Sequence, residues 1–590
     1  MINLELKLRQ WTRFRWVACQ LEVLAKCSNL SELRKDLHSL PSTLEETYER
    51  ILLSIPEERR NDVVELLQWL AFSVRPLTLL EMAEVFAIDR DKHRFDPDRR
   101  PRKPHAILNN CSSLVKVTYT DGYNTVSVRE SGTLSLAHLS VKEYLISERI
   151  RNSKKFPLPY YHLDVKFANS AISCDCLLYL LQFPTAACSC NEIEASTSFG
   201  RYAAEFWITH ARSNDGVIQN HVQEWVMKLL SSSVVHLNNW IRLFDVDQGG
   251  SDFFLRATED EPRPLYYASL LGLGQIVREL ALGSPADVDV VGGYDGSALA
   301  SALARGHEEV VKILPENGAD VNIAGGFYGS PLASASANGH KELVQILLKK
   351  GANVNLGGGF SGSALMLGFA KFFKGDIKSE GYSKMSGEFR YNFKVALAKA
   401  HLETMQFLLG NGANENMAGG YYGSALASAS AGGHQEVVQI LLKNGAKVNM
   451  AGGFYGSALA SASTRGHKEV VHILLKNGAD VNMAGGFYGS ALASASADGH
   501  EGIVQILLQN KANVNMAGGY HGSALASAWN KGHEEIVHIL LLNGADEEIG
   551  TFTDFAYYRR ASDNRRNSRP AVRTDMGPEA QNSHPDVRTD

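Results

Sequence analysis

Two pairs of cysteines are the first candidates for chemistry in this chain. One residue separates Cys174 from Cys176, and one separates Cys188 from Cys190. Structural zinc sites usually place about two to four residues between paired cysteines. The apolar pattern around Cys174 also predicts a helix over 163–183. We therefore predict that these cysteines pack within a helical segment and bind no metal.

No other arrangement of reactive side chains stands out in the sequence. It contains no Gly-x-x-x-x-Gly-Lys-(Ser/Thr) loop, the motif whose backbone and lysine hold nucleotide phosphates. No Ser-His-Asp, Cys-His or paired-carboxylate pattern rises above the background of the 590 residues. We predict that the protein is not an enzyme and has neither a catalytic residue nor a cofactor.

Composition narrows the choice of partners. The formal net charge is −5, without the basic excess that nucleic-acid binding requires. We find no apolar run long enough to span a membrane and no secretory signal. The 7 cysteines do not form a disulfide scaffold. We expect a cytoplasmic protein without membrane contact, whose partners are proteins rather than nucleic acids.

Pairs of aromatic residues recur every 33 residues, as at Phe454-Tyr455 and Phe487-Tyr488. Tyrosine is a frequent hot-spot residue because it presents a rigid apolar body and a hydroxyl. We predict a ladder of rings that contacts a protein ligand, mainly through the second position of each pair. Alternatively, one ring of each pair packs against the next pair. The predicted protein-binding residues are Tyr294, Tyr328, Tyr422, Tyr455, Tyr488 and His521.

Two sets of positions vary between repeats that are otherwise nearly identical. One set precedes a Gly-His pair and the other follows a Gly-Ala pair. A constant scaffold with a changing surface suits an adaptable recognition face, but neutral drift at exposed sites explains the variation equally well. The predicted variable face consists of Arg305, Asn338, Arg465, Asp498, Lys531, Lys447 and Asp480.

The period itself predicts a solenoid of stacked units. The motif Gly-Ser-(Ala/Pro)-Leu recurs at intervals of 33 residues except for one interval of 61, which contains a 28-residue insertion within about 366–395. This insertion is either a functional loop or a translated intron. The motif begins at Gly296, Gly329, Gly362, Gly423, Gly456, Gly489 and Gly522.

Each unit is expected to form two helices. In a representative unit, Ser424 caps an Ala- and Ser-rich first helix, and Gly433 adopts a left-handed conformation after it. The second helix, 435–443, carries a wide apolar stripe. Two units depart from this pattern. Pro315 removes a helical donor, and Lys511 stands where other units have glycine.

The period, the helix pairs and the tail Gly-Ala-Asp-Val-Asn at 478–482 resemble the ankyrin repeat. The Gly-His start of each second helix, as at His467, fits the same family. The family's Thr-Pro-Leu-His opening reads Ser-Ala-Leu-Ala here, so its histidine is absent at Ala427. The resemblance implies about eight helix–turn–helix repeats that bind a protein ligand on a concave face. We expect the recurring histidines to be structural, capping or bridging adjacent turns.

Residues 59–154 follow the pattern of a winged helix. A helix over 61–72 and a capping box starting at Thr78 predict helix–turn–helix. Strands are expected at 114–119 and 125–130, with a third at 134–138. A second capping box, starting at Ser140, is expected to open a helix that runs to about Ile150.

Four segments within residues 14–150 resemble the end of the NACHT module in fungal NLR-like (STAND) proteins. The resemblance implies an ATPase core and a winged-helix histidine, here His138, that contacts nucleotide. Because the phosphate loop is absent, we expect His138 to be a packed or capping residue. The basic run at 99–103 is expected to be a solvated loop. The matching segments are 14–24, 40–52, 69–82 and 136–145.

The predicted fold class is mostly α, an ankyrin solenoid preceded by a helical and winged-helix-like domain. We expect Phe552, Phe555 and Tyr557 to fold over Leu542 as an end cap. The predicted domains are the helical end of a NACHT-like module (1–58), a winged-helix-like domain (59–154), a helical linker that caps the array (155–262), the ankyrin repeats (263–549) and a disordered tail (550–590).

We interpret the chain as a non-enzymatic scaffold for protein–protein recognition. By resemblance, it is the sensor part of a fungal NLR-like protein that acts in non-self recognition or incompatibility. Three alternatives stay open: a fragment of a nucleotide-dependent NACHT signalling switch, an ankyrin adaptor acting alone, and a winged-helix DNA-associated regulator.

Overall fold

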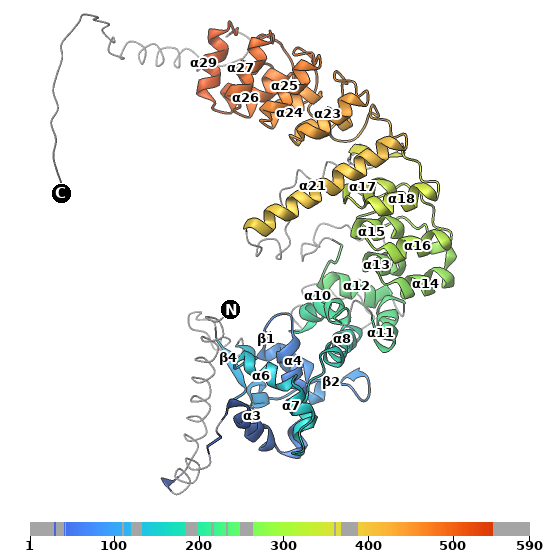
Figure 1. Cartoon of the computed structure of the whole chain (residues 1–590), viewed down its shortest axis with the longest axis vertical. Helices are drawn as coiled ribbons and strands as arrows, with labels where there is room; N and C mark the ends of the chain where they lie inside the picture. Colours follow the sequence, from blue (N-terminus) through green and yellow to red (C-terminus); the bar gives the residue numbers. More distant parts are fainter. Residues whose placement is uncertain are drawn as a thin grey trace, which may run out of the picture. The chain divides into compact units, whose positions relative to one another are not determined.

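The structure, a computed structural model, is drawn in Figure 1 and divides into two compact units, residues 1–327 and 328–590. The first unit contains the winged-helix domain, a helical segment and two repeats, and the second contains the remaining repeats. The described residues are 29–30, 40–41, 43–108, 111, 113–119, 132–183, 198–213, 218–231, 234–247, 263–358, 362–366 and 387–546. The predicted end cap at 552–557 and most of the predicted N-terminal helices lie outside them.

Capping side chains start the helices of the winged-helix domain. Thr43 accepts a hydrogen bond from the Glu46 amide at 3.1 Å. Thr78 and Glu81 form the complete predicted capping box, each side chain bonding to the other's backbone amide. These local signals confirm the predicted helix–turn–helix. The helices are α3 (Leu44–Leu53), α4 (Arg60–Phe72) and α5 (Leu79–Val85).

A three-stranded antiparallel sheet completes this domain. Its order is β1-β5-β4, with Leu77 opposite Leu134 and Val115 opposite Leu136. The strands predicted at 114–119 and 134–138 are confirmed, whereas 125–130 lies outside the described residues. The sheet strands are β1 (Leu77–Thr78), β4 (Val115–Thr118) and β5 (Thr133–Leu136), and a separate pair is β2 (Ile88–Asp89) with β3 (Arg94–Phe95).

The helix after β5 begins earlier than predicted. The Nδ1 atom of His138 accepts a hydrogen bond from the Ser140 amide at 3.2 Å, which makes His138 the N-cap of α6 (Leu139–Leu145). The predicted capping box at Ser140 is therefore wrong, because its hydroxyl bonds instead to the Tyr48 hydroxyl at 2.8 Å. The predicted single helix is also divided, since α7 (Glu148–Arg151) is separate. The expectation that His138 is a capping residue is confirmed.

The helical segment between the winged helix and the repeats has an aromatic core. Trp207 and Trp240 pack edge to face with ring centroids 6.0 Å apart. Trp240 also lies 5.9 Å from Tyr267 of the first repeat, so the segment shares its core with the start of the array. The helix predicted over 163–183 is confirmed as the first of the helices that the structure describes in this segment. They are α8 (Val165–Leu181), α10 (Gly200–Ala211), α11 (Asn220–Ser231) and α12 (Val234–Leu243).

A buried charge cluster joins the winged helix to this segment. The Arg90 guanidinium is 2.5 Å from Asp175 and 3.4 Å from Glu65, which lies on α4. The Trp69 indole donates a further hydrogen bond to Asp175 at 3.2 Å. One cation thus serves two buried carboxyl groups. Burial raises the pKa of the Glu65 carboxyl to about 7, although Arg90 acts against this shift.

The repeats in the first unit follow the predicted two-helix pattern. Pro315 lies in the last turn of α16, and the helix runs past it to Glu316. Proline therefore costs this helix one backbone donor without breaking it. The pairs are α13 (Pro264–Leu270) with α14 (Gly274–Gly283), and α15 (Ala298–Arg305) with α16 (Glu308–Glu316).

The second unit continues the pattern (Figure 1). The insertion falls largely at 367–386, outside the described residues, and the helix that follows it, α21 (Gly387–Gly410), has 24 residues where other second helices here have 9. The elements are α17 (Pro331–Ala337), α18 (Lys341–Lys349), β6 (Gly357–Gly358), β7 (Gly362–Ser363), α22 (Ala425–Ala431), α23 (Gln435–Lys443), α24 (Ala458–Thr464), α25 (Lys468–Lys476), α26 (Ala491–Ala497), α27 (Glu501–Gln509), α28 (Ala524–Asn530) and α29 (Glu534–Leu542).

The predicted caps of the repeat are confirmed. The Ser424 hydroxyl accepts a hydrogen bond from the Ala427 amide at 3.1 Å. Gly433 has φ +71°, the left-handed conformation predicted after the first helix. Lys511, which replaces glycine after a second helix, has φ +67° and is thus a non-glycine residue held in the same region.

Histidines connect consecutive repeats. The Nε2 atom of His467, just before α25, lies 3.0 Å from the carbonyl oxygen of Ala431. Ala431 ends α22, the first helix of the preceding repeat. A carbonyl can only accept, so the histidine donates. The same bridge recurs from His307 to Leu270, His401 to Ala337, His500 to Thr464 and His533 to Ala497. The structural role predicted for these histidines is confirmed.

Asparagines form a second bridge that the sequence analysis missed. The Asn449 side chain accepts from the Asp480 amide at 2.7 Å and donates to the Gly478 carbonyl at 3.0 Å. Asn482 makes the equivalent pair of bonds to Asn513 and Lys511. Each repeat therefore fixes the backbone of the next at the turn after its second helix.

Candidate protein-binding surface

The aromatic pairs lie on short loops, here called fingers, that connect consecutive repeats. In the finger 452–456 the Gly452 amide donates to the Gly456 carbonyl at 3.1 Å. Neighbouring fingers approach so closely that a Cβ atom on Gly453 would lie 2.2 Å from the Tyr422 backbone. Glycine is required at this position both for that approach and for its φ of +71°.

The first ring of each pair stacks on the first ring of the next finger. Centroids are 5.1 Å apart between Tyr421 and Phe454 and 5.0 Å apart between Phe454 and Phe487. Tyr520 stacks on Phe487 at 5.0 Å. In the first unit, Tyr294 and Phe327 stack in the same way at 5.1 Å. The ladder predicted from the sequence is therefore present, with the first rings forming its stack.

Backbone hydrogen bonds fix the spacing of these rings. The Phe454 amide donates to the Tyr421 carbonyl, and the Phe487 amide donates to the Phe454 carbonyl, both at 2.7 Å. Tyr520 bonds to Phe487 at the same distance. Because the rings are held by backbone bonds as well as by stacking, little conformational entropy remains to be lost when a partner covers them.

Exposure separates the two rings in several pairs, in the reverse of the predicted order, whereas Tyr421 and Tyr422 are both partly buried. The first rings Phe454, Phe487 and Tyr520 are 37%, 36% and 73% exposed, whereas Tyr455 is 5% exposed and Tyr328 is 8% exposed. Tyr455 and Tyr328 are thus poor contacts for a partner. The other predicted second-position residues, Tyr422, Tyr488 and His521, are partly buried, and so is Tyr294, which is a first ring.

Packing explains why the second rings turn inward. Tyr455 stands edge-on to Phe454 at 5.1 Å, and the Arg465 guanidinium lies 5.8 Å from its ring centroid. Burial raises the pKa of Tyr422 and Tyr488, so their hydroxyls stay protonated at neutral pH. These tyrosines therefore act mainly as supports for the exposed first rings.

The predicted variable face is exposed at six of its seven positions. The exception is Asn338, which is partly buried and donates to the Ser334 carbonyl at 2.9 Å. Arg305 also has a structural contact, because it donates to the Asp247 carbonyl at 3.1 Å. The exposed positions are Arg305, Arg465, Asp498, Lys531, Lys447 and Asp480.

The variation after Gly-Ala has a structural explanation. The amides of Lys447 and Asp480 donate to an asparagine of the preceding repeat, each at 2.7 Å. The varying residue takes part in these bonds only through its backbone amide, so they do not constrain its side chain. The Asp480 carboxylate does accept a bond from the Asn482 amide at 2.9 Å. Aspartate or asparagine therefore stabilises the turn here, and Lys447 shows that the turn forms without it.

The cysteines of the helical segment lie where a metal ligand is disfavoured. Cys174 and Cys176 are on α8, and Cys188 and Cys190 lie outside the described residues. Burial raises the pKa of the Cys174 thiol to about 12 and also raises that of Cys176 well above its ordinary value. The thiolate, which is the metal-binding form, is thereby destabilised.

The winged-helix domain holds a basic groove. A cavity of about 490 Å³ is lined by the basic residues Arg59, Arg99, Arg102 and Lys103 and by one acid, Asp62. Arg59 pairs with Asp62 at 3.3 Å and Arg99 pairs with Asp89 at 3.2 Å. The basic run predicted as a loop thus contributes to a recess with an excess of positive charge.

Comparison with known proteins agrees with this architecture. Residues 251–357 and 393–485 match the family described as Ankyrin repeats (3 copies). Residues 50–157 match the family described as GPI inositol-deacylase, winged helix domain. The chain is therefore a mostly helical protein that carries a winged-helix domain followed by ankyrin repeats, as predicted. The NACHT origin of its N-terminal part stays a prediction.

A relative of similar sequence comes from the fungus Monascus ruber. It is the Azaphilone pigments biosynthesis cluster protein L, 35% identical over 303 residues, a span that covers 49% of this chain and 62% of that protein. The matched region thus covers less than two thirds of the relative. Within the described part of this chain, none of the helices has the length and apolar content needed to cross a membrane.

Proposed function

We propose that this chain is a non-enzymatic scaffold that binds a protein partner through the exposed first rings of its fingers. The observation that carries the proposal is the stack Phe454–Phe487–Tyr520, which remains exposed although backbone bonds hold it rigid. Rigid aromatic surfaces of this kind supply most of the binding energy in many interfaces. Ankyrin arrays elsewhere are used for protein interaction, which agrees with this role.

Site-specific photo-crosslinking tests this proposal. A benzophenone amino acid placed at Phe487 is expected to capture a protein partner from cells, whereas the same group at Gln509, an exposed residue on a second helix, is not. The double substitution Phe487→Ser and Tyr520→Ser should then weaken the captured complex by about tenfold or more. The matched control is Tyr455→Phe, which removes only the hydroxyl group of a buried ring. Equal binding by the double variant and the control would refute the proposal.

Within this role, we place the chain as the sensor part of a fungal NLR-like protein. The support is the order of a winged helix followed by an ankyrin array, together with a relative from a filamentous fungus. The alternative of a nucleotide-dependent switch predicts that the complete gene product binds ATP. Equilibrium dialysis of that product with ATP is the test. Absence of binding would exclude the nucleotide-dependent switch and favour the alternative of an ankyrin adaptor that acts alone.

One observation favours a second candidate function, binding of nucleic acid by the winged helix. It is the basic groove that contains Arg102 and Lys103. This function predicts that duplex DNA binds with strong salt dependence and that the double substitution Arg102→Ala and Lys103→Ala lowers the slope of that dependence. Binding that is absent at low salt would remove this candidate.

A further inference from the structure

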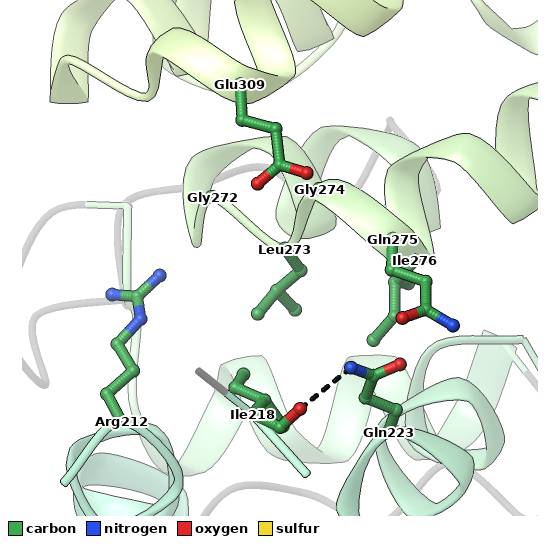
Figure 2. Close-up of a pocket in the computed structure, with 9 residues that line it drawn as sticks. All are labelled: Arg212, Ile218, Gln223, Gly272, Leu273, Gly274, Gln275, Ile276 and Glu309. Carbon is green, nitrogen blue, oxygen red and sulfur yellow. Dashed lines mark hydrogen bonds between the residues drawn. The ribbon is translucent and has the colours of Figure 1, made fainter. Parts of the chain in front are cut away.

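A cavity of about 220 Å³ lies in the first unit, between the helical segment and the first repeat (Figure 2). One side is formed by Arg212, which follows α10, and by Ile218 before α11. The other side is formed by the turn at Leu273 and the first residues of α14, with Glu309 of α16 beside it. None of the motifs discussed above includes this cavity.

At the wall of the cavity the first repeat lacks a side chain that most other repeats have, and the Glu309 carboxyl group lies in its place. Leu273 has φ −88° and ψ 70°, close to the −82° and 80° of His307, so the two residues are structurally equivalent. The following residue is Gly274, and a Cβ atom there would lie 2.4 Å from the Glu309 carboxyl carbon. Six other repeats carry a long polar side chain at that position: Glu308, Lys341, Gln435, Lys468, Glu501 and Glu534.

Opposite charges face this space. Figure 2 shows the Arg212 and Glu309 side chains extending toward the cavity from different elements. Neither makes an ion pair with any residue in the described part of the chain. Burial lowers the pKa of the Arg212 guanidinium, which means that its charge is poorly solvated. A ligand that carries both charges would compensate the arginine and the glutamate together.

The volume of the cavity and its lining residues limit the class of ligand further. A protein cavity of about 150 Å³ accommodates benzene, which has six carbon atoms. By proportion, 220 Å³ holds about nine non-hydrogen atoms. Leu273, Ile276 and Ile218 supply apolar contacts beside the charged groups. These properties describe a small zwitterion with an aliphatic part.

We propose that this cavity binds a free α-amino acid with a small aliphatic side chain. Its carboxylate pairs with Arg212, its ammonium group pairs with Glu309, and its side chain contacts Leu273. The first repeat and the helical segment before it would thus form a metabolite site, separate from the aromatic fingers. This role goes beyond protein recognition and does not depend on it.

Calorimetric titration of the full chain tests the proposal. The probes are L-valine, L-leucine, L-isoleucine and L-methionine. Two fragments of leucine, 3-methylbutylamine and 4-methylpentanoate, each lack one of the charged groups. We expect saturable binding of at least one amino acid, and binding of either fragment about tenfold weaker than that of leucine. Absence of binding by all four amino acids, or fragments that bind as tightly as leucine, would overturn the proposal.

Three variants locate the site. Gly274→Gln restores the side chain typical of the other repeats and should displace the Glu309 carboxyl group from the cavity wall, lowering affinity by about tenfold or more. Arg212→Gln removes the cation and should lower affinity by a similar factor. A thermal melt shows whether each variant folds, and Arg212→Gln provides the test if Gly274→Gln does not fold. Gly502→Gln is the control, because a Cβ atom at Gly502 meets no atom within 4 Å. Unchanged affinity in a folded Gly274→Gln or Arg212→Gln protein would contradict the assignment.

Discussion

Lys511 offers a direct measurement of backbone strain in the array. Its φ is +67°, and its amide donates to the Leu508 carbonyl at 3.0 Å. The equivalent residue one repeat earlier is Gly478, with φ +83° and an amide bond to Leu475 of 3.1 Å. The two turns therefore have the same backbone and differ mainly in the side chain that must tolerate a left-handed conformation.

The magnitude follows from two opposing effects. A left-handed conformation costs an L-residue about 1 to 2 kcal/mol. Glycine recovers this cost but loses about 0.4 to 1 kcal/mol through its greater freedom in the unfolded chain. We expect Lys511→Gly to raise the free energy of unfolding by about 0.5 to 1 kcal/mol. The reverse change, Gly478→Lys, should lower it by a similar amount, because a Cβ atom at Gly478 meets no atom within 4 Å.

Urea unfolding followed by circular dichroism is the assay, with hydrogen exchange in α27 and α29 as a local readout. Local exchange is needed because repeat arrays unfold by units, so a change at one turn acts chiefly on its neighbours. Opposite shifts of the two variants are expected. Shifts in the same direction, or destabilisation by Lys511→Gly, would refute the claim that strain at this turn is set by the side chain.

Three further predictions concern buried and bridging groups. Because the pKa of Glu65 is raised to about 7, the folded state retains a proton that the unfolded state has released, so unfolding free energy should fall as pH rises from about 4.5 to 7. Glu65→Gln should remove that slope in pH-dependent urea titrations. His467→Ala should destabilise the array by about 1 kcal/mol, measured by urea unfolding, through loss of the bond to Ala431. Asn449→Ala should accelerate hydrogen exchange of the Asp480 amide, whereas unchanged exchange would contradict the bridge.

The features predicted correctly are those with local causes. The Ser424 hydroxyl caps a helix by accepting from the Ala427 amide, only three residues later. The left-handed turn at Gly433 depends only on the backbone of that residue. The period of the repeat then determines the order of the elements. Even the error at Ser140 was local, because His138 and Ser140 could each cap the helix and the Ser140 hydroxyl bonds instead to the Tyr48 hydroxyl.

Features that depend on contacts between repeats were harder to predict. The sequence places Phe454 and Tyr455 side by side, but their exposures of 37% and 5% are set by a neighbouring finger and by Arg465. The Asn449 bridge likewise joins residues in different repeats, and asparagine in a turn has an ordinary local explanation. The placement of the Glu309 carboxyl group beside Gly274 also depends on a contact between two repeats.

The bridges between repeats also bear on how such a gene can change length. The histidine bridges at His467, His500 and His533 each span 36 residues, and the asparagine bridges span 31 and 29. From Asn416 onward these offsets are constant, so a deletion or duplication of one complete 33-residue unit there rejoins donors to equivalent acceptors. The bridge from His401 to Ala337, which spans 64 residues, shows that an insertion within a unit can also leave a bridge in place. Such a gene can therefore gain or lose a whole repeat in one event, and with it one ring of the exposed stack, while the protein still folds.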